Sequence, residues 1–166
     1  MQRTLSRWAL YAAMLFLVGC DHATKVVARD ALVSGRVITL IRGWLDLRYT
    51  ENFDTAFSLT HGWDGAAKSV VLMATTVMTT AVVLVIAWRR RNRGTRLERA
   101  GLGLVLAGAI GNTLDRVRRG YVVDFIHVHH WPIFNMADIL VVVGALLLLA
   151  SSWVSGRHPP QGLSSA

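Results

Sequence analysis

The sequence predicts an all-α membrane protein, with four transmembrane helices and a small β-rich segment outside the membrane. Hydrophobic residues make up 53% of the 166 residues and charged residues only 17%, whereas soluble domains carry about 25% charged residues. The apolar residues also gather in long segments that polar residues separate. We therefore expect one four-helix transmembrane domain over residues 1–156, followed by a disordered cytoplasmic tail at 157–166.

The four apolar segments differ in ways that predict their surroundings. The first is interrupted near its end by Asp21 and Lys25, and the second has twenty residues without a charge, enough to cross about 30 Å of hydrocarbon. The third is short and rich in glycine and alanine, which let helix backbones approach closely. The fourth is the most lipophilic. The predicted spans are residues 8–28, 69–88, 100–114 and 137–154.

The arginines predict the orientation in the membrane. Six of them fall within residues 89–99, between two apolar segments, and such a basic loop is typical of the cytoplasmic side. Both termini should then be cytoplasmic, and residues 29–68 and 115–133 should lie outside. The net charge of +8 is explained by this topology, so we expect no nucleic-acid partner.

The first outer segment, residues 29–68, has strand-like composition. Residues 36–41 and 44–49 are rich in β-branched and aromatic side chains, and Arg42-Gly43 between them suits a turn. We expect a small sheet on the outer membrane surface. The single cysteine, Cys20, excludes an internal disulfide and a cysteine-based zinc site.

Two aspartates lie where an apolar chain should avoid them. Asp124 lies within Val-Val-Asp-Phe-Ile, and Asp138 comes just before the fourth apolar segment. A carboxylate at the edge of hydrocarbon is costly unless it is paired, solvated or neutralised. Two of them are consistent with a pair that shares one proton and activates water. The alternative is that both cap helix N-termini, where aspartate is favoured.

Further polar residues fall at the predicted outer ends of the spans. We interpret most of them as membrane-interface anchors, with ion pairs of Asp21 with Lys25 and of Asp115 with Arg116 that support helix packing. The asparagines among them suit hydrogen bonds between helices. The full set is Asp21, Lys25, Asn52, Asn112, Asp115, Arg116 and Asn135.

A histidine cluster beside Asp124 raises a metal alternative. His127, His129 and His130 with a carboxylate could bind zinc, and in an extended chain His127 and His129 would lie on one side. However, the sequence contains no His-Glu-x-x-His motif. We therefore favour histidines at the membrane interface beside Trp131, and no metal.

Five motifs together resemble the lipoprotein signal peptidase (signal peptidase II) family. They cover the chain from about residue 8 to 150 in the family's order, and it is the order of all five, on a four-span frame, that makes the resemblance specific. They read Asp21-His-Ala-Thr-Lys25, Asn52-Phe-Asp-Thr-Ala-Phe57, Gly108-Ala-Ile-Gly-Asn-Thr-Leu-Asp-Arg116, Val122-Val-Asp-Phe-Ile126 and Phe134-Asn-Met-Ala-Asp138.

The resemblance implies a hydrolase, an aspartic endopeptidase of the bacterial inner membrane with its active site near the outer face. Asp124 and Asp138 would be its catalytic residues, and the seven polar residues named above would shape or support the site. The substrate would be a prolipoprotein, cut before a cysteine that already carries diacylglycerol. The resemblance implies no cofactor. We expect a monomer, with membrane lipids and the lipid-modified substrate as its partners.

Three features leave alternatives open. Asp54 stands where the family usually has glycine, which could alter pH dependence or indicate a specialised paralogue. Leu17-Val-Gly-Cys20 resembles a lipobox, by which the chain would itself be a lipoprotein cleaved before Cys20. The intramembrane acids could instead belong to a non-catalytic four-helix binding or transport subunit that carries protons.

Overall fold

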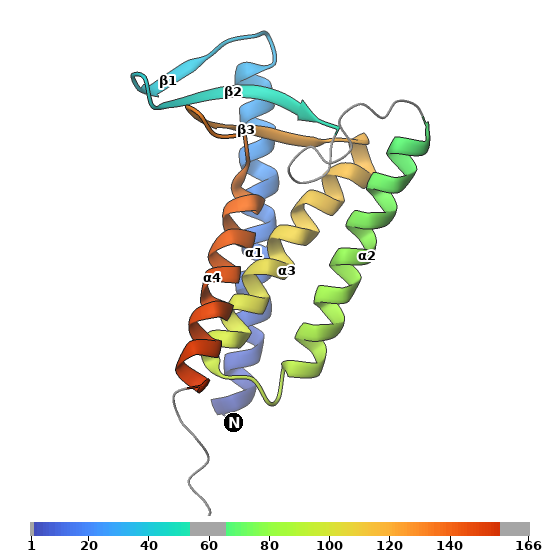
Figure 1. Ribbon diagram of the computed structural model, residues 1–166, viewed down its shortest axis with the longest axis vertical. Coiled ribbons are helices and arrows are strands. Elements are labelled where there is room, and N and C mark those ends of the chain that lie inside the picture. The colour runs from blue at the N-terminus through green and yellow to red at the C-terminus, as the bar shows by residue number, and fades with distance from the viewer. Residues whose placement is uncertain (1, 54–65, 157–166) are drawn as a thin grey trace, which may run out of the picture.

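The computed structural model describes residues 2–53 and 66–156, which form long helices with a small sheet at one end (Figure 1). Asp54 and the predicted tail at 157–166 lie outside the described residues. The elements in chain order are α1 (Gln2–Leu32), β1 (Ile38–Ile41), β2 (Leu45–Asn52), α2 (Ala66–Arg90), α3 (Arg96–Arg119), β3 (Val122–Val128) and α4 (Met136–Gly156).

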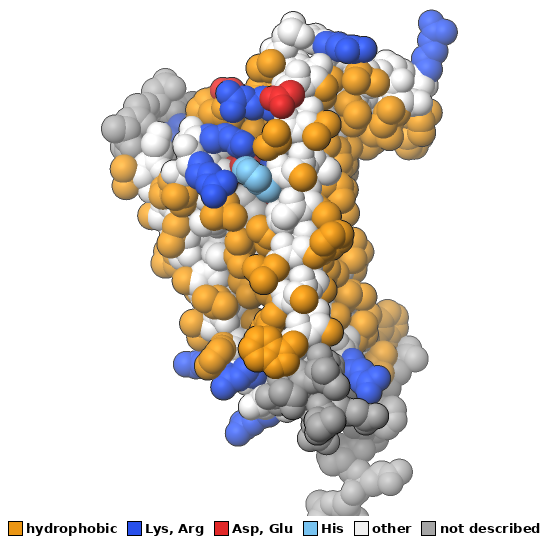
Figure 2. Space-filling model, turned by 180° about the vertical axis from the view of Figure 1, so that it is seen from behind, with side chains coloured by type: hydrophobic (Ala, Val, Ile, Leu, Met, Phe, Trp, Pro, Cys, Tyr) orange, Lys and Arg blue, Asp and Glu red, His pale blue; other side chains and the backbone are white. Residues whose placement is uncertain are grey.

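Three of these helices are long and apolar enough to cross a membrane, over Trp8–Leu32, Lys68–Arg90 and Met136–Val154. Large apolar side chains on them are exposed, among them Leu15 (75%) and Leu149 (66%). Hydrophobic side chains cover the middle of the molecule, while arginine and lysine gather towards its two ends (Figure 2). This distribution is that of a protein whose middle faces hydrocarbon.

The remaining long helix, α3, is the central one and contacts α1, α2 and α4. Its described residues do not form an apolar window like those of the other three helices, because the helix begins and ends with charged residues. Small residues allow the close contact with α4. A Cβ atom on Gly108 would collide with the carbonyl oxygen of Ala137, and one on Gly101 would lie 2.9 Å from that of Gly144.

Two helices extend further than the sequence predicted. α1 continues to Leu32 instead of residue 28, and α3 continues to Arg119 instead of residue 114. The prediction ended each span where apolar residues gave way to charged ones. The last turn of α1 is instead stabilised by packing, since Leu32 is 2% exposed and lies with Ala28 against Phe125.

The sheet is antiparallel in the order β1-β2-β3. The predicted hairpin is present as β1 and β2, and Gly43 in its turn has a φ of 76°, a conformation that glycine adopts without strain. The third strand, β3, comes from the α3–α4 connection and pairs with β2. It was not predicted as a sheet strand, because its partner lies about 75 residues earlier in the chain. This pairing places Asp124 opposite Thr50, above the helices.

Candidate functional site

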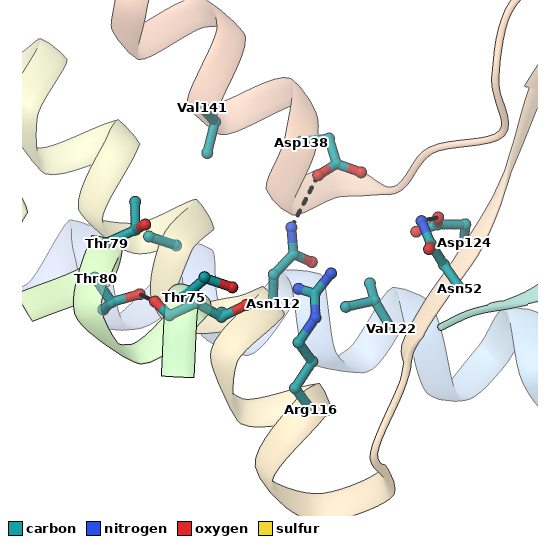
Figure 3. A pocket seen from close by; sticks show the side chains of 12 residues that line it. Asn52, Thr75, Thr79, Thr80, Asn112, Arg116, Val122, Asp124, Asp138 and Val141 are labelled. Atoms are coloured by element: carbon teal, nitrogen blue, oxygen red, sulfur yellow. Dashed lines mark hydrogen bonds between the residues drawn. The ribbon is translucent and has the colours of Figure 1, made fainter. Parts of the chain in front are cut away.

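A pocket of about 350 Å³ opens between α2, α3, α4 and the sheet (Figure 3). Asp124 and Asp138, which lie fourteen residues apart in the sequence, both line it. α3 contributes Asn112 and Arg116, and Figure 3 shows the end of the Arg116 side chain beside Asn112, on the side of the pocket where Asp138 lies. The other lining residues are Asn52, Thr75, Thr76, Thr79, Thr80, Ala109, Val122 and Val141.

Asp124 extends from β3 and is almost fully buried, at 3% exposure. Its Oδ2 accepts a hydrogen bond of 2.8 Å from the Asn52 side-chain amide, and its Oδ1 accepts one of 2.6 Å from that of Asn135. The pKa of Asp124 is raised to about 6, chiefly by burial and also by the negative charge of Asp138, while the amide hydrogen bonds from Asn52 and Asn135 oppose the shift. Asp124 is therefore a carboxyl group that holds its proton unusually well.

Asp138 lies in the first turn of α4. Its Oδ2 accepts from the backbone N–H of Asn135 at 3.1 Å, and the Asn135 side-chain oxygen accepts from the backbone N–H of Asp138 at 3.1 Å. This reciprocal arrangement is a capping box. The capping alternative therefore describes Asp138, but its Oδ1 also accepts from Asn112 at the pocket, at 2.8 Å. It does not describe Asp124, which lies on a strand.

Asn112 connects the pocket to a buried group of charges. Its side-chain nitrogen donates to Asp138, and its oxygen accepts from the Asn135 amide at 3.2 Å and from Lys25 Nζ at 3.0 Å. Because one amide group is engaged at both ends, its orientation is determined. The interhelical hydrogen bonds expected of Asn112 are confirmed, whereas Asn135 lies just before α4 and links that end of the helix to α3 and β3.

Lys25 is fully buried and lies between two carboxylates, 2.8 Å from Asp21 Oδ2 and 2.9 Å from Asp115 Oδ2. Asp115 also pairs with Arg119 at 2.7 Å. Asp21 Oδ1 accepts from the backbone N–H of Ala137, at the start of α4, at 2.9 Å. These residues, which we call the Lys25 network, join α1, α3 and α4, and Lys25 connects them to the pocket through Asn112.

The Lys25 network corrects part of the sequence interpretation. The predicted pair of Asp21 and Lys25 is present, but Asp21, Lys25 and Asp115 are buried between helices rather than placed as interface anchors. The ion pairs of Asp115 are with Lys25 and Arg119, whereas Arg116 lines the pocket. Consecutive residues on a helix point in different directions, so Asp115 and Arg116 face different neighbours.

Comparison with known proteins decides the family. The family model described as Signal peptidase (SPase) II matches residues 13–154. The chain is 38% identical over 153 residues to the lipoprotein signal peptidase of Syntrophotalea carbinolica, with 82% of this chain and 91% of that protein covered. It is 34% identical over 149 residues to that of Moorella thermoacetica, with 87% and 95% covered. The chain belongs to the signal peptidase II family.

The fold is shared with solved structures as well. A bacterial membrane enzyme superposes with a TM-score of 0.77 at 23% identity, covering 94% of each chain, and a second does so with a TM-score of 0.73 at 24% identity, covering 87% of this chain and 92% of that one. Signal peptidase II is a membrane protease that removes signal peptides from prolipoproteins, so the family identifies this chain as an enzyme. The alternative of a non-catalytic transport subunit is thereby disfavoured.

One wall of the signal peptidase II pocket was missed by the sequence analysis. Thr75, Thr76, Thr79 and Thr80 line it from α2. The hydroxyl groups of Thr80 and Thr113 lie 2.8 Å apart and link this wall to α3. The repeat of threonine pairs four residues apart on one face of an otherwise apolar helix was the available signal.

The histidine cluster lies apart from the pocket. Asp124 and His127 are three residues apart on β3, so their side chains leave opposite faces of the strand. The carboxylate near His127 and His129 is Asp46 of β2 and not Asp124. The metal alternative considered from sequence therefore paired the histidines with the wrong aspartate.

Proposed function

We propose that Asp124 and Asp138 are the catalytic pair of an aspartic endopeptidase, which removes the signal peptide of a prolipoprotein by cutting before the diacylglyceryl-modified cysteine. The observation that carries this proposal is the convergence of both carboxylates on one pocket, although they come from a strand and a helix. Amide groups of Asn52, Asn112 and Asn135 hold them in place.

The surroundings of the two carboxyl groups suggest separate roles. Burial raises the pKa of Asp124 to about 6, so we assign Asp124 as the acid that protonates the scissile carbonyl oxygen or the leaving amine. Asp138 lies in the first turn of α4 and accepts from the backbone N–H of Asn135 there, a position at which the helix dipole favours an ionised carboxylate. Asp138 is then the base that takes a proton from the attacking water.

The remaining site residues support this chemistry in our proposal. Arg116, at the same pocket, balances the negative charge of the pair. The Lys25 network fixes the position of Asn112, and Asn112 in turn fixes that of Asp138. The threonine wall of α2 offers hydroxyl groups to an extended peptide backbone, which needs hydrogen-bond partners at membrane depth. No cofactor takes part in this mechanism.

The topology in the membrane follows from the same picture. We propose that α3 crosses the membrane with the other three helices and is sheltered by them. The α2–α3 connection lies at the same end as the start of α1 and the end of α4, while the sheet lies at the opposite end (Figure 1). The arginines of that connection assign their end to the cytoplasm. The enzyme is then a monomer of the bacterial inner membrane, in contact with lipids and with its pocket near the outer face.

Cysteine labelling tests this orientation. In a Cys20→Ala background, a probe at Arg42→Cys should react with an impermeant reagent in intact cells, and one at Asn92→Cys should react only after the cells are opened. Both native side chains are exposed, so a cysteine that does not react is separated from the reagent by the membrane and is not hidden by burial in the protein. The reverse labelling pattern would place the pocket in the wrong compartment. In the wild-type protein, which keeps Cys20, an intact mass without a lipid on that residue would exclude the lipobox alternative.

Cleavage tests the activity. Purified protein in detergent, without any ion gradient, should cut a diacylglyceryl prolipoprotein peptide immediately before the modified cysteine. A peptide with an unmodified cysteine tests the requirement for lipid. Glu51→Gln is the matched control for loss of a carboxylate, because Glu51 is an exposed acid of the same sheet, outside the pocket. Absence of cleavage by the wild-type protein would contradict the proposal.

A further inference from the structure

A second polar cluster lies on the sheet, on the opposite face of β3 from Asp124. Asp46 pairs with His127 across β2 and β3, and His129 follows two residues later on the same face, with its ring centroid 5.1 Å from that of His127. His129 Nε2 lies 3.0 Å from Asp46 Oδ2, and His127 Nδ1 lies 3.8 Å from the same oxygen. All three potential ligand atoms lie within 4.8 Å of one another.

One of these atoms lacks a partner within the described part of the chain. His127 Nδ1 is buried and makes no hydrogen bond there. A buried polar atom without a partner is costly, and proteins normally satisfy such atoms. The cluster is nevertheless open to solvent, because the His129 side chain is 37% exposed and that of His127 is 18% exposed.

We propose that Asp46, His127 and His129 form a binding site for a divalent transition-metal cation of the zinc or copper type. Two imidazole nitrogens and one carboxylate oxygen are a donor set that zinc accepts, with the fourth position left to water. At metal–ligand distances of about 2.0–2.2 Å, tetrahedral ligands lie roughly 3.4 Å apart. The two distances from Asp46 Oδ2, 3.0 and 3.8 Å, fall on either side of that value, and rotations of the two rings would adjust the ligand atoms to it.

Arg48 is the competitor for this site. Its Nη2 lies 3.1 Å from Asp46 Oδ2, and its side chain is 38% exposed. A bound cation must displace this guanidinium group, which can move into solvent. If the metal site exists, removal of the Arg48 charge should tighten metal binding. If the ion pair of Arg48 with Asp46 is merely structural, the same change should remove that pair and have no effect on metal binding.

The consequence of binding would be local. The metal would join β2 to β3 beyond the register shift that lies between Leu47 and Thr50. It would hold the strand that carries Asp124 while leaving the proposed catalytic pair untouched. Bound metal should thus raise the melting temperature of the protein and leave the cleavage rate nearly unchanged.

The experiment is a calorimetric titration with Zn²⁺. The full-length, untagged protein is first treated with a chelator and is kept in detergent. One equivalent should bind. His127→Asn and His129→Asn should each weaken binding at least about tenfold, while the control His130→Asn should not, because His130 lies outside the cluster. Arg48→Met should tighten binding. Cu²⁺ electron paramagnetic resonance should show two nitrogen ligands in the wild type and one in each of the two variants.

Three results would overturn the proposal. They are no saturable Zn²⁺ binding, binding that survives His127→Asn and His129→Asn unchanged, and weaker binding by Arg48→Met. The copper spectrum of the wild-type protein keeps the test decisive if a histidine variant fails to fold. A spectrum without nitrogen ligands would exclude the cluster directly.

Discussion

Two pairs of aspartates in this molecule differ in what surrounds them. Asp21 and Asp115 are paired with the cations Lys25 and Arg119. Asp124 and Asp138 accept hydrogen bonds from the amide groups of three asparagines. A cation holds a carboxylate in its charged form, whereas neutral amides position it and leave its proton free to move. The difference separates aspartates that hold helices together from aspartates suited to chemistry.

The largest effect should come from the amide-held pair. Asp124→Asn and Asp138→Asn should each lower the single-turnover cleavage rate on the order of 10³-fold or more, because Asn can neither donate the shared proton nor act as a base. Binding of an uncleaved lipopeptide should remain. Substantial cleavage by either variant would refute the aspartic mechanism.

The same change should spare stability at Asp124. The pKa of Asp124 in the folded protein is about 6, above its ordinary value of 3.8. Between these values the folded state binds more protons, so stability falls as pH rises and the full penalty is present above pH 6. At about pH 8, Asp124→Asn should therefore melt at or above the wild-type temperature. Clear destabilisation there would show that Asp124 has a structural role like that of Asp115.

The cation-held group should show the reverse. Lys25→Met leaves two buried carboxylates without their shared cation, and breaking such a pair costs about 3–5 kcal/mol. Thermal unfolding in detergent should show a large fall in melting temperature, accompanied by a loss of activity through Asn112. Arg90→Met is the control, because Arg90 is 60% exposed in its pair with Glu98 and exposed pairs contribute little. Equal melting of the two variants would remove the distinction.

How far the sequence predicts each group depends on how local its contacts are. The ends of α2 and α4 lie within about three residues of the predicted spans, because unbroken apolar runs determine them. The hairpin around Gly43 was predicted from its turn residues. The pairing of Lys25 with Asp115 was not predicted, since ninety residues separate them. Composition marks polar residues as unusual, but only packing decides which of them meet.

The residues of the pocket also differ in how well the sequence predicts them. Asp124 and Asp138 were selected because carboxylates are costly at the edge of hydrocarbon, and that reasoning required no structure. The threonine wall of α2 was overlooked, because a threonine in an apolar helix satisfies its hydroxyl group on the preceding turn, as Thr75 does with Val71. Side chains that cost little to bury leave a weak signal in a sequence.

The pH dependence of cleavage measures the shared proton. The rate should fall as pH rises through the upper apparent pKa of the pair, near or above 6, because Asp124 then loses its proton. It should also fall at lower pH, when the second carboxylate is protonated. A profile of kcat/KM against pH should thus be bell-shaped, with values that belong to the pair. A flat profile between about pH 5 and 9 would contradict a shared proton.

The smallest effect should come from the amide groups themselves, and Asn52 is the most direct test. Its side-chain N–H donates to Asp124 at 2.8 Å and lowers the pKa of that carboxyl group. Asn52→Ala removes this donor, so the pKa of Asp124 should rise and the alkaline limb of the profile should move to higher pH. One lost hydrogen bond to a charged group is worth about 1.5–3 kcal/mol, which sets the upper limit of the shift.

A matched variant distinguishes charge from lost contact. Asn52→Asp places a carboxylate beside Asp124, and its negative charge should move the alkaline limb further than Asn52→Ala does. Thr50→Ala is the control, because Thr50 pairs with Asp124 in the sheet but does not line the pocket. If both Asn52 variants lowered the rate without moving the profile, Asn52 would only position Asp124. The neutral amides would then be a scaffold for the pair, and the proton affinity of Asp124 would be determined by burial and by the charge of Asp138.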